Sequence, residues 1–140
     1  MSTDVETIRS IIESVGANWD KHAFHLSKEH FADTVEIDYR SLGAPAVTQD
    51  TPDTLEGNWK AVLLGFDRTE HLIDNFAIEL TTGEDGVERA VSQSYVLAYH
   101  LIRGAEEGES WTLMGRYEHA LERRDGGAWK ITKMALNVEQ

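Results

Sequence analysis

Four long runs with strand character fill the second half of this chain, and they constrain its fold more than any other feature. The runs span residues 69–80, 88–103, 111–124 and 129–138. The glycine-containing stretches between them span residues 82–86, 104–109 and 125–127. Long strands joined by such turns are typical of an antiparallel meander. The sequence therefore predicts one long antiparallel sheet from residue 69 to residue 138.

The first half of the chain shows helical periodicity. Apolar residues recur at three- and four-residue steps at Val5, Ile8, Ile12, Val15 and Trp19, and a capping box over residues 3–6 precedes them. We then expect a helix over roughly 21–31, a strand over 35–39, a loop over 41–51 and a third helix beginning at Thr51-Pro52. Helices followed by a long curved sheet indicate an α+β domain with its helices on one face.

Composition excludes several classes of function for these 140 residues. The formal net charge is −12 and the basic residues are scattered, so we expect neither a nucleic-acid nor an anionic-membrane surface. The lack of cysteine removes thiolate nucleophiles and cysteine metal ligands. No apolar run approaches the roughly 20 residues of a membrane span, and residues 1–10 are too polar for a signal peptide. We expect a single domain over residues 1–140, located in the cytoplasm.

The run at 90–102 has two different faces, because successive strand residues point to opposite sides of a sheet. The residues of one face are small and partly polar: Ala90, Ser92, Ser94, Val96, Ala98, His100 and Ile102. The other face carries Val91, Gln93, Tyr95, Leu97, Tyr99 and Leu101. Small side chains leave space in front of them, so we expect the first face to form the wall of a cavity. A single β-bulge would exchange the two faces.

The candidate catalytic residues are Asp20, Tyr39, His71 and His100. Asp20 closes the first helical region, Tyr39 lies in the stretch 37–41, and the two histidines lie inside two later strands. Gathered in one pocket, these side chains would make an acid–base site that needs neither metal nor cofactor. Each also has a structural interpretation, as a helix cap, a core tyrosine or a hydrogen-bonded strand histidine. Only their combination favours catalysis.

These motifs resemble the SnoaL-like, nuclear transport factor 2-like superfamily, and within it the scytalone dehydratases. The resemblance rests on Trp19–Ser41, Arg68–His71 and Ala90–His100, with Gly115 at the family's spacing. It implies a cone-shaped α+β barrel in which a curved antiparallel sheet wraps around the N-terminal helices. It also implies a homo-oligomer, either a dimer or a trimer.

The resemblance further implies a role for each candidate residue. Tyr39 would orient a water that polarises the substrate carbonyl. His71 and His100 would be the acid–base pair, and Asp20 would orient His100. The sequence departs from the family at Trp19, where the family has a second water-holding tyrosine, because an indole donates a hydrogen bond but accepts none.

Four residues are predicted to contact the substrate. Trp19 and Trp59 would form part of the pocket wall. Arg116 and His119 lie in the stretch 116–121, where the family's serine and asparagine substrate contacts fall. His119 would then be a third histidine of the pocket.

The predicted function is that of a cofactor-independent dehydratase, a lyase acting on a hydrophobic carbonyl-bearing small molecule by α-proton abstraction and loss of water. A ketosteroid-isomerase-like isomerase or a polyketide cyclase is the alternative, since these also begin with proton abstraction. An epoxide hydrolase or aldol-type cyclase would centre instead on Asp38 or Asp74. A non-catalytic binding module of the same fold is the remaining alternative, with His71 and His100 pointing apart or plugged by Trp19 and Trp111.

Overall fold

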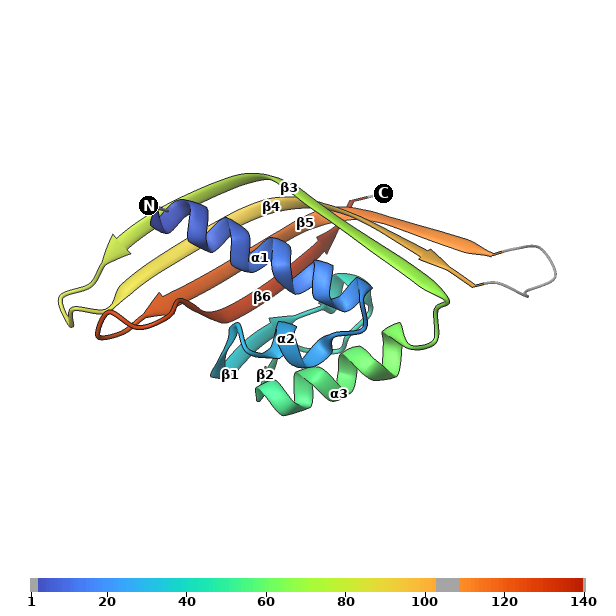
Figure 1. The fold of residues 1–140 in the computed structure, drawn as a ribbon, viewed down its shortest axis with the longest axis horizontal. Coiled ribbons are helices and arrows are strands. Elements are labelled where there is room, and N and C mark those ends of the chain that lie inside the picture. Colours follow the sequence, from blue (N-terminus) through green and yellow to red (C-terminus); the bar gives the residue numbers. More distant parts are fainter. Residues whose placement is uncertain (1–2, 103–108, 140) are drawn as a thin grey trace.

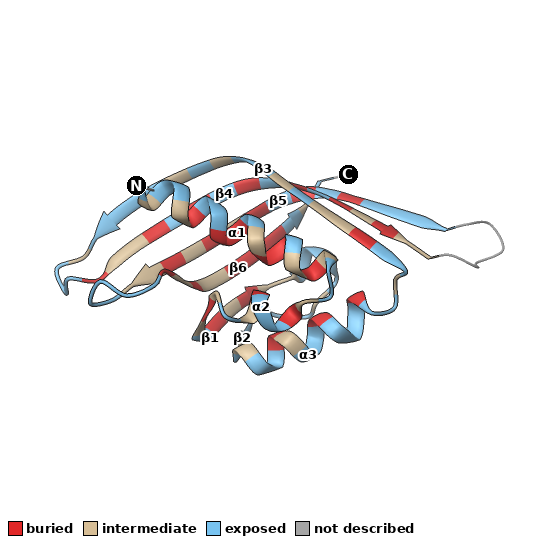
Figure 2. Ribbon diagram, in the orientation of Figure 1, coloured by how far each residue is buried: buried red, intermediate tan, exposed pale blue. Residues whose placement is uncertain are grey.

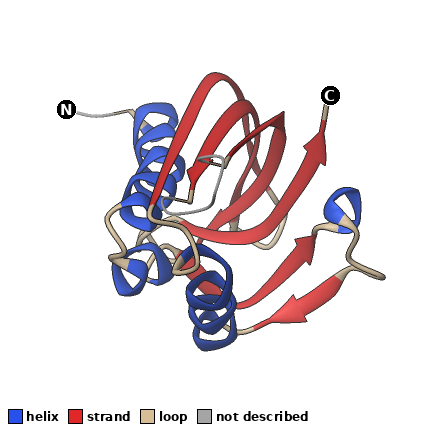
Figure 3. Ribbon diagram, turned by 90° about the vertical axis from the view of Figure 1, so that its right-hand side faces the viewer, coloured by secondary structure: helices blue, strands red, loops and turns tan. Residues whose placement is uncertain are grey.

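The computed structural model describes residues 3–102 and 109–139. The helices are α1 (Asp4–Asp20), α2 (Phe24–Lys28), the short 3₁₀ helix η1 (Arg40–Leu42) and α3 (Pro52–Leu63). The strands are β1 (Phe31–Asp38), β2 (Thr48–Asp50), β3 (Arg68–Thr82), β4 (Glu88–Leu101), β5 (Ser110–Arg123) and β6 (Lys130–Val138). The strands form one curved, cone-like sheet, and α1, α2 and α3 lie on one side of it (Figures 1 and 3).

The predicted antiparallel meander is confirmed for β3 to β6. The sheet order is β2-β1-β6-β5-β4-β3, and each neighbouring pair from β3 to β6 is antiparallel. The sheet as a whole is mixed, because β1 pairs with β6 in parallel. The predicted α+β fold with a curved, cone-shaped sheet is confirmed, with the difference that the sheet is not antiparallel throughout. Its two edges, β2 and β3, stay unpaired with each other.

The chain before β2 differs from the prediction in two places. The second helix covers only Phe24–Lys28, since His22 takes a left-handed conformation with φ 59° after α1 and β1 already begins at Phe31. The predicted loop over 41–51 contains part of η1 and the edge strand β2. The third helix begins as predicted: the Thr51 side chain accepts from the Thr54 N–H, with Pro52 at the first helical position.

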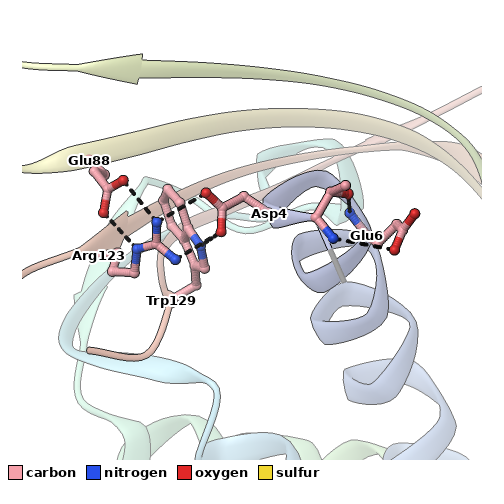
Figure 4. A network of polar contacts seen from close by, with 6 residues as sticks. Asp4, Glu6, Glu88, Arg123 and Trp129 are labelled. Atoms are coloured by element: carbon pink, nitrogen blue, oxygen red, sulfur yellow. Dashed lines mark hydrogen bonds and ion pairs between the residues drawn. The ribbon is translucent and has the colours of Figure 1, made fainter. Parts of the chain in front are cut away.

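Helix α1 lies across the inner face of the sheet, and polar contacts fix where it starts. The predicted capping box is present, since the Thr3 side chain accepts from the Glu6 N–H and the Glu6 carboxylate accepts from the Thr3 N–H. Arg123 of β5 donates to both carboxylate oxygens of Asp4, at 2.8 and 3.0 Å (Figure 4). The same guanidinium pairs with Glu88 and lies 4.8 Å above the Trp129 ring.

The hydrophobic core lies between the three helices α1, α2 and α3 and the inner face of the sheet (Figure 2). On α1 it includes Ile8, Ile12, Val15 and Trp19 as predicted, whereas Val5 is 42% exposed. On β4 the predicted small face is buried from Ala90 to His100, because no bulge interrupts the register between β4 and β5. Within the described ranges, no helix is long and apolar enough to cross a membrane. The predicted turn at 104–109 falls largely outside those ranges.

Candidate active site

A cavity of about 360 Å³ opens between the inner face of the sheet, α3 and the segment 39–50. Its apolar wall consists of Trp19, Ile37, Leu42, Ala44, Ala46, Leu55, Trp59, Val62, Leu63, Ala98, Trp111, Leu113 and Leu136. Its polar lining consists of Tyr39, Thr48, Asp50, Asn58, His71, His100 and Tyr117. Among the described residues that line it there is no lysine or arginine. The cavity therefore offers an apolar environment with a few hydrogen-bonding groups, as small-molecule sites do.

Asp20 and His71 form a close pair at the edge of this cavity. His71 Nδ1 lies 2.7 Å from Asp20 Oδ1, and the His71 backbone N–H donates to Asp20 Oδ2 at 2.8 Å. The Thr69 hydroxyl donates to Asp20 Oδ1 at 3.0 Å. Because a carboxylate only accepts hydrogen bonds, Nδ1 carries a proton. In the neutral imidazole, Nε2 is then the basic nitrogen.

The prediction that Asp20 orients His100 is wrong, since its partner is His71. Asp20 is the last residue of α1, and α1 crosses the sheet beside β3 rather than β4. Gly16 allows this close approach, because a Cβ at position 16 would lie 3.2 Å from the Cβ of His71. The carboxylate therefore reaches Thr69 and His71 on β3, one strand short of His100.

His100 faces His71 across the cavity wall, with 5.8 Å between the two ring centroids. Its Nδ1 lies 3.1 Å from the carbonyl oxygen of Trp111, so Nδ1 donates and Nε2 is again the accepting nitrogen. The ring stacks on Trp111 at 4.5 Å and touches Phe66. Burial lowers the pKa of His100, the proximity of His71 lowers it further, and the bond to the Trp111 carbonyl opposes both effects. His100 is accordingly neutral at neutral pH.

Two tyrosines add hydroxyl groups to the cavity. Tyr39 lines it as expected, and its hydroxyl donates to the sulfur of Met134 at 3.9 Å. Burial raises the pKa of both Tyr39 and Tyr117, so both hydroxyls stay protonated and serve as donors. Tyr117 was not among the candidates. The alternation of β5 indicates it, because adjacent residues point to opposite faces and apolar Leu113 and Leu121 share the face of Tyr117.

The two tryptophans predicted at the pocket wall lie there. Trp19 meets Trp59 edge-on at 5.4 Å and His71 edge-on at 5.2 Å. The indole N–H of Trp19 is buried and has no hydrogen-bond partner within the described chain. It is thus an unused donor on a residue that lines the cavity. Contact of either tryptophan with a substrate stays a prediction.

Arg116 and His119 do not line the cavity, so their placement as substrate contacts is wrong. Arg116 points to the outer face, where it pairs with Glu139 at 2.9 Å and covers the Tyr95 ring. His119 faces inward but lies deeper, 2% exposed and beside Tyr117. The register explains both positions, because Arg116 is opposite outward Tyr95 while His119 is opposite buried Ser92.

The carboxylates required by the hydrolase and aldol-type alternatives lie outside the cavity. Asp38 binds the Arg40 guanidinium through both oxygens, and these contacts lower its pKa to about 2. The Asp74 side chain is 81% exposed and contacts Arg9. No group of three or more metal-ligating side chains is found in the part of the chain that the structure describes.

Comparisons with known proteins agree with this architecture. A family model described as a SnoaL-like domain matches residues 1–135. A search of curated proteins finds no match. Among solved structures, protein Kfla4162 from Kribbella flavida is 21% identical with a TM-score of 0.85, covering 98% of this chain and 91% of that one.

Two further solved structures carry names of enzymes. A protein from Novosphingobium aromaticivorans, provisionally named a scytalone dehydratase, is 20% identical with a TM-score of 0.78 over 98% of this chain and 85% of its own. The hexachlorocyclohexane dehydrochlorinase LinA-type3 from Novosphingobium barchaimii is 18% identical with a TM-score of 0.76, over 96% and 85% of the two chains. At these identities the likeness shows the fold alone.

Proposed function

The chain belongs to the SnoaL-like domain family, and from this premise we propose that it is a cofactor-independent dehydratase acting on a hydrophobic β-hydroxy carbonyl compound. The observation that carries the proposal is the pair of Asp20 and His71, with 2.7 Å between Oδ1 and Nδ1, at the edge of an apolar cavity. A carboxylate bound to one imidazole nitrogen makes the other nitrogen a positioned base.

The first step is removal of the α-proton by His71 Nε2. The electron pair of the C–H bond moves to the carbonyl, which becomes an enolate, and His71 becomes an imidazolium stabilised by Asp20. The enolate oxygen needs hydrogen-bond donors, and the Trp19 indole N–H and a tyrosine hydroxyl provide them. Because the donors are already fixed in the wall, little reorganisation accompanies the charge development.

The second step expels the β-hydroxyl group. The enolate electrons form the carbon–carbon double bond, the C–O bond breaks, and the imidazolium of His71 gives its proton to the departing oxygen. The products are an α,β-unsaturated carbonyl compound and water, and His71 is neutral again. Before this step, the substrate hydroxyl group donates a hydrogen bond to His100 Nε2, which orients the leaving group.

The lining also restricts the substrate. The described wall has no cationic side chain to pair with a carboxylate or phosphate, and Asp50 is its one carboxylate. Burying an unpaired anion there would be costly. The substrate is therefore neutral and largely apolar, and it fits a cavity of about 360 Å³.

The same pair supports an isomerase, because His71 is able to return its proton to a different carbon of the dienolate. The test is incubation of neutral hydrophobic β-hydroxy ketones and β,γ-unsaturated ketones with the protein in D₂O, followed by NMR and mass spectrometry. Loss of water supports dehydration, and a shifted double bond supports isomerisation. If no α-proton of any substrate exchanges, the acid–base proposal fails and a binding module becomes the better description.

Variants connect the chemistry to the site. We expect His71→Ala and His100→Ala each to abolish turnover with the fold retained. His25→Ala is the matched control, since His25 lies on an exposed face of α2 away from the cavity. Near-full activity of either cavity variant would contradict the proposal.

The homo-oligomer expected from the family resemblance stays a prediction, which analytical ultracentrifugation would test.

A further inference from the structure

Buried polar atoms without partners gather in one place outside the cavity. Within the described chain, four buried side-chain atoms have no hydrogen-bond partner: Trp19 Nε1, Ser92 Oγ, Ser94 Oγ and His119 Nδ1. The first belongs to the cavity wall, and the other three lie together on β4 and β5. Buried polar groups are rarely left unpaired, so three in one place require an explanation.

The register of the sheet places these three residues in a compact block. Ser92 is directly opposite His119, and Ser94 is directly opposite Tyr117. The rings of Tyr117 and His119 lie 5.2 Å apart. Tyr117 lines the cavity, whereas Ser92, Ser94 and His119 do not. The block therefore lies immediately behind the part of the cavity wall that Tyr117 forms.

The elements packed around the block supply no polar partner. The buried residues of α1 are Ile8, Ile11, Ile12, Val15, Gly16 and Trp19. On the flanking strands, Ile78 is opposite Ser92, and Leu121 follows His119 on the same face. The chain does satisfy a buried serine elsewhere, since the Ser27 hydroxyl donates to the Val15 carbonyl at 2.8 Å. The three unpartnered atoms are thus a local exception.

The composition of the block suits a bridging molecule, because its residues are neighbours in the register and none of the three polar atoms has a partner in the described chain. A buried water makes about three hydrogen bonds, which matches a site with two hydroxyls and one imidazole nitrogen. Burial also lowers the pKa of His119 to about 3, so its ring is neutral and able to pair with water in either direction.

We propose that Ser92, Ser94 and His119 form an internal water-binding site behind the cavity wall, distinct from the catalytic cavity. Its ligand is water because the atoms are uncharged and enclosed, and because their residues are neighbours in the register of the sheet. The site backs the wall at Tyr117, so the bound water helps to hold that side chain in place. This inference does not depend on which reaction the cavity catalyses.

The sign of a stability change tests the proposal. If water pairs with the serine hydroxyls, Ser92→Ala and Ser94→Ala each remove one bond from a satisfied site, and the melting temperature falls by about 3–6 °C. Ser27→Ala is the matched control, since it removes a hydrogen bond that a buried serine makes in the structure. Its melting temperature is expected to fall by a similar amount. If the site is dry, the same two variants remove an unpaired polar atom and the melting temperature stays equal or rises.

A crystal structure of the full chain, with and without a cavity ligand, completes the test. Water density within hydrogen-bond distance of Ser92 Oγ, Ser94 Oγ and His119 Nδ1 in both crystals supports the proposal. Three results overturn it: an empty site, direct bonds among the three side chains, or replacement of the water by part of the cavity ligand. The last result would make the block a deep extension of the substrate site.

Discussion

The replacement Asp20→Asn tests the candidate site most sharply, because it changes one oxygen while keeping the shape of the side chain. Asp20 accepts from three donors, with its two oxygens divided between the His71 ring and the His71 backbone. An asparagine has one accepting oxygen and one amino group. If the oxygen faces the backbone N–H, the amino group faces Nδ1 and forces the proton onto Nε2. His71 Nε2 then carries a hydrogen and no longer acts as the base.

The size of the effect follows from the distance between the charges. Opposite unit charges 2.7 Å apart interact by about 6 kcal/mol at an effective dielectric constant near 20. The Asp20 side chain is 20% exposed and the proton is only partly transferred in the transition state, so roughly half of this energy acts on the rate. About 3 kcal/mol corresponds to roughly a 10²-fold loss of kcat, and the tautomer change brings the loss toward about 10⁴-fold.

The assay is the steady-state rate of the parent and variant proteins on a substrate found by the incubation test described under Proposed function, together with thermal unfolding. Asp74→Asn is the matched control, because Asp74 is exposed and lies outside the cavity. We expect the control to keep its kcat and Asp20→Asn to lose it with little change in melting temperature. A rate for Asp20→Asn within about threefold of the parent would refute the reasoning. Loss of activity in Asp74→Asn alone would favour the carboxylate-centred alternative.

Three other results are expected. Thr69→Val removes the hydroxyl that positions Asp20, so kcat should fall about tenfold and the pH–rate profile should shift. Thr69→Ser keeps a hydroxyl and should restore both. An unchanged pH–rate profile in Thr69→Val would limit Thr69 to a structural role. Trp19→Phe removes the unpartnered indole donor, so kcat should fall by about 10-fold or more while KM changes little; an equal rise in KM would indicate ground-state binding instead. His119 has a folded pKa of about 3, below its unfolded value, so the unfolded state binds more protons between about pH 3 and 6.5 and stability rises with pH there. Denaturant titrations at several pH values should show that the free energy of unfolding of the parent rises by roughly 1 kcal/mol more per pH unit than that of His119→Phe. Equal slopes of the unfolding free energy against pH in the two proteins would contradict the assignment.

The strands could be predicted from the sequence because their signals are local. Alternation placed His100 on the inner face of β4. This prediction is correct because the β4–β5 pairing has no register shift, whereas the β3–β4, β5–β6 and β1–β6 pairings each have one. The parallel pairing of β1 with β6 joins two segments that are far apart in the sequence, and no local pattern specifies it. On β5 the prediction chose Arg116 and missed Tyr117, because the sequence alone does not show which of two adjacent strand residues faces inward.

The histidine that binds the Asp20 carboxylate could not be identified from the sequence, for a different reason. His71 and His100 are both inward-facing strand residues, and their rings are 5.8 Å apart. Which of them meets the carboxylate depends on where α1 crosses the sheet. That crossing is set by the close approach of Gly16 to His71 and by the contacts of Asp4 with Arg123 at the other end of the helix. Neither contact is visible in a helical periodicity.

The position of Asp20 in its own helix also bears on its role. A carboxylate is unfavourable at a helix C-terminus, where the partial charge of the helix dipole is already negative, and the last turn of α1 has no basic residue to offset it. Thr69 and His71 satisfy the carboxylate with three hydrogen bonds, so the helix end tolerates it. A residue that opposes the local preference of its helix and is held by bonds from another element is typical of a functional site. This explains why replacing Asp20 should reduce the rate far more than the stability: asparagine loses the charge on which the base depends and relieves the helix of the same charge.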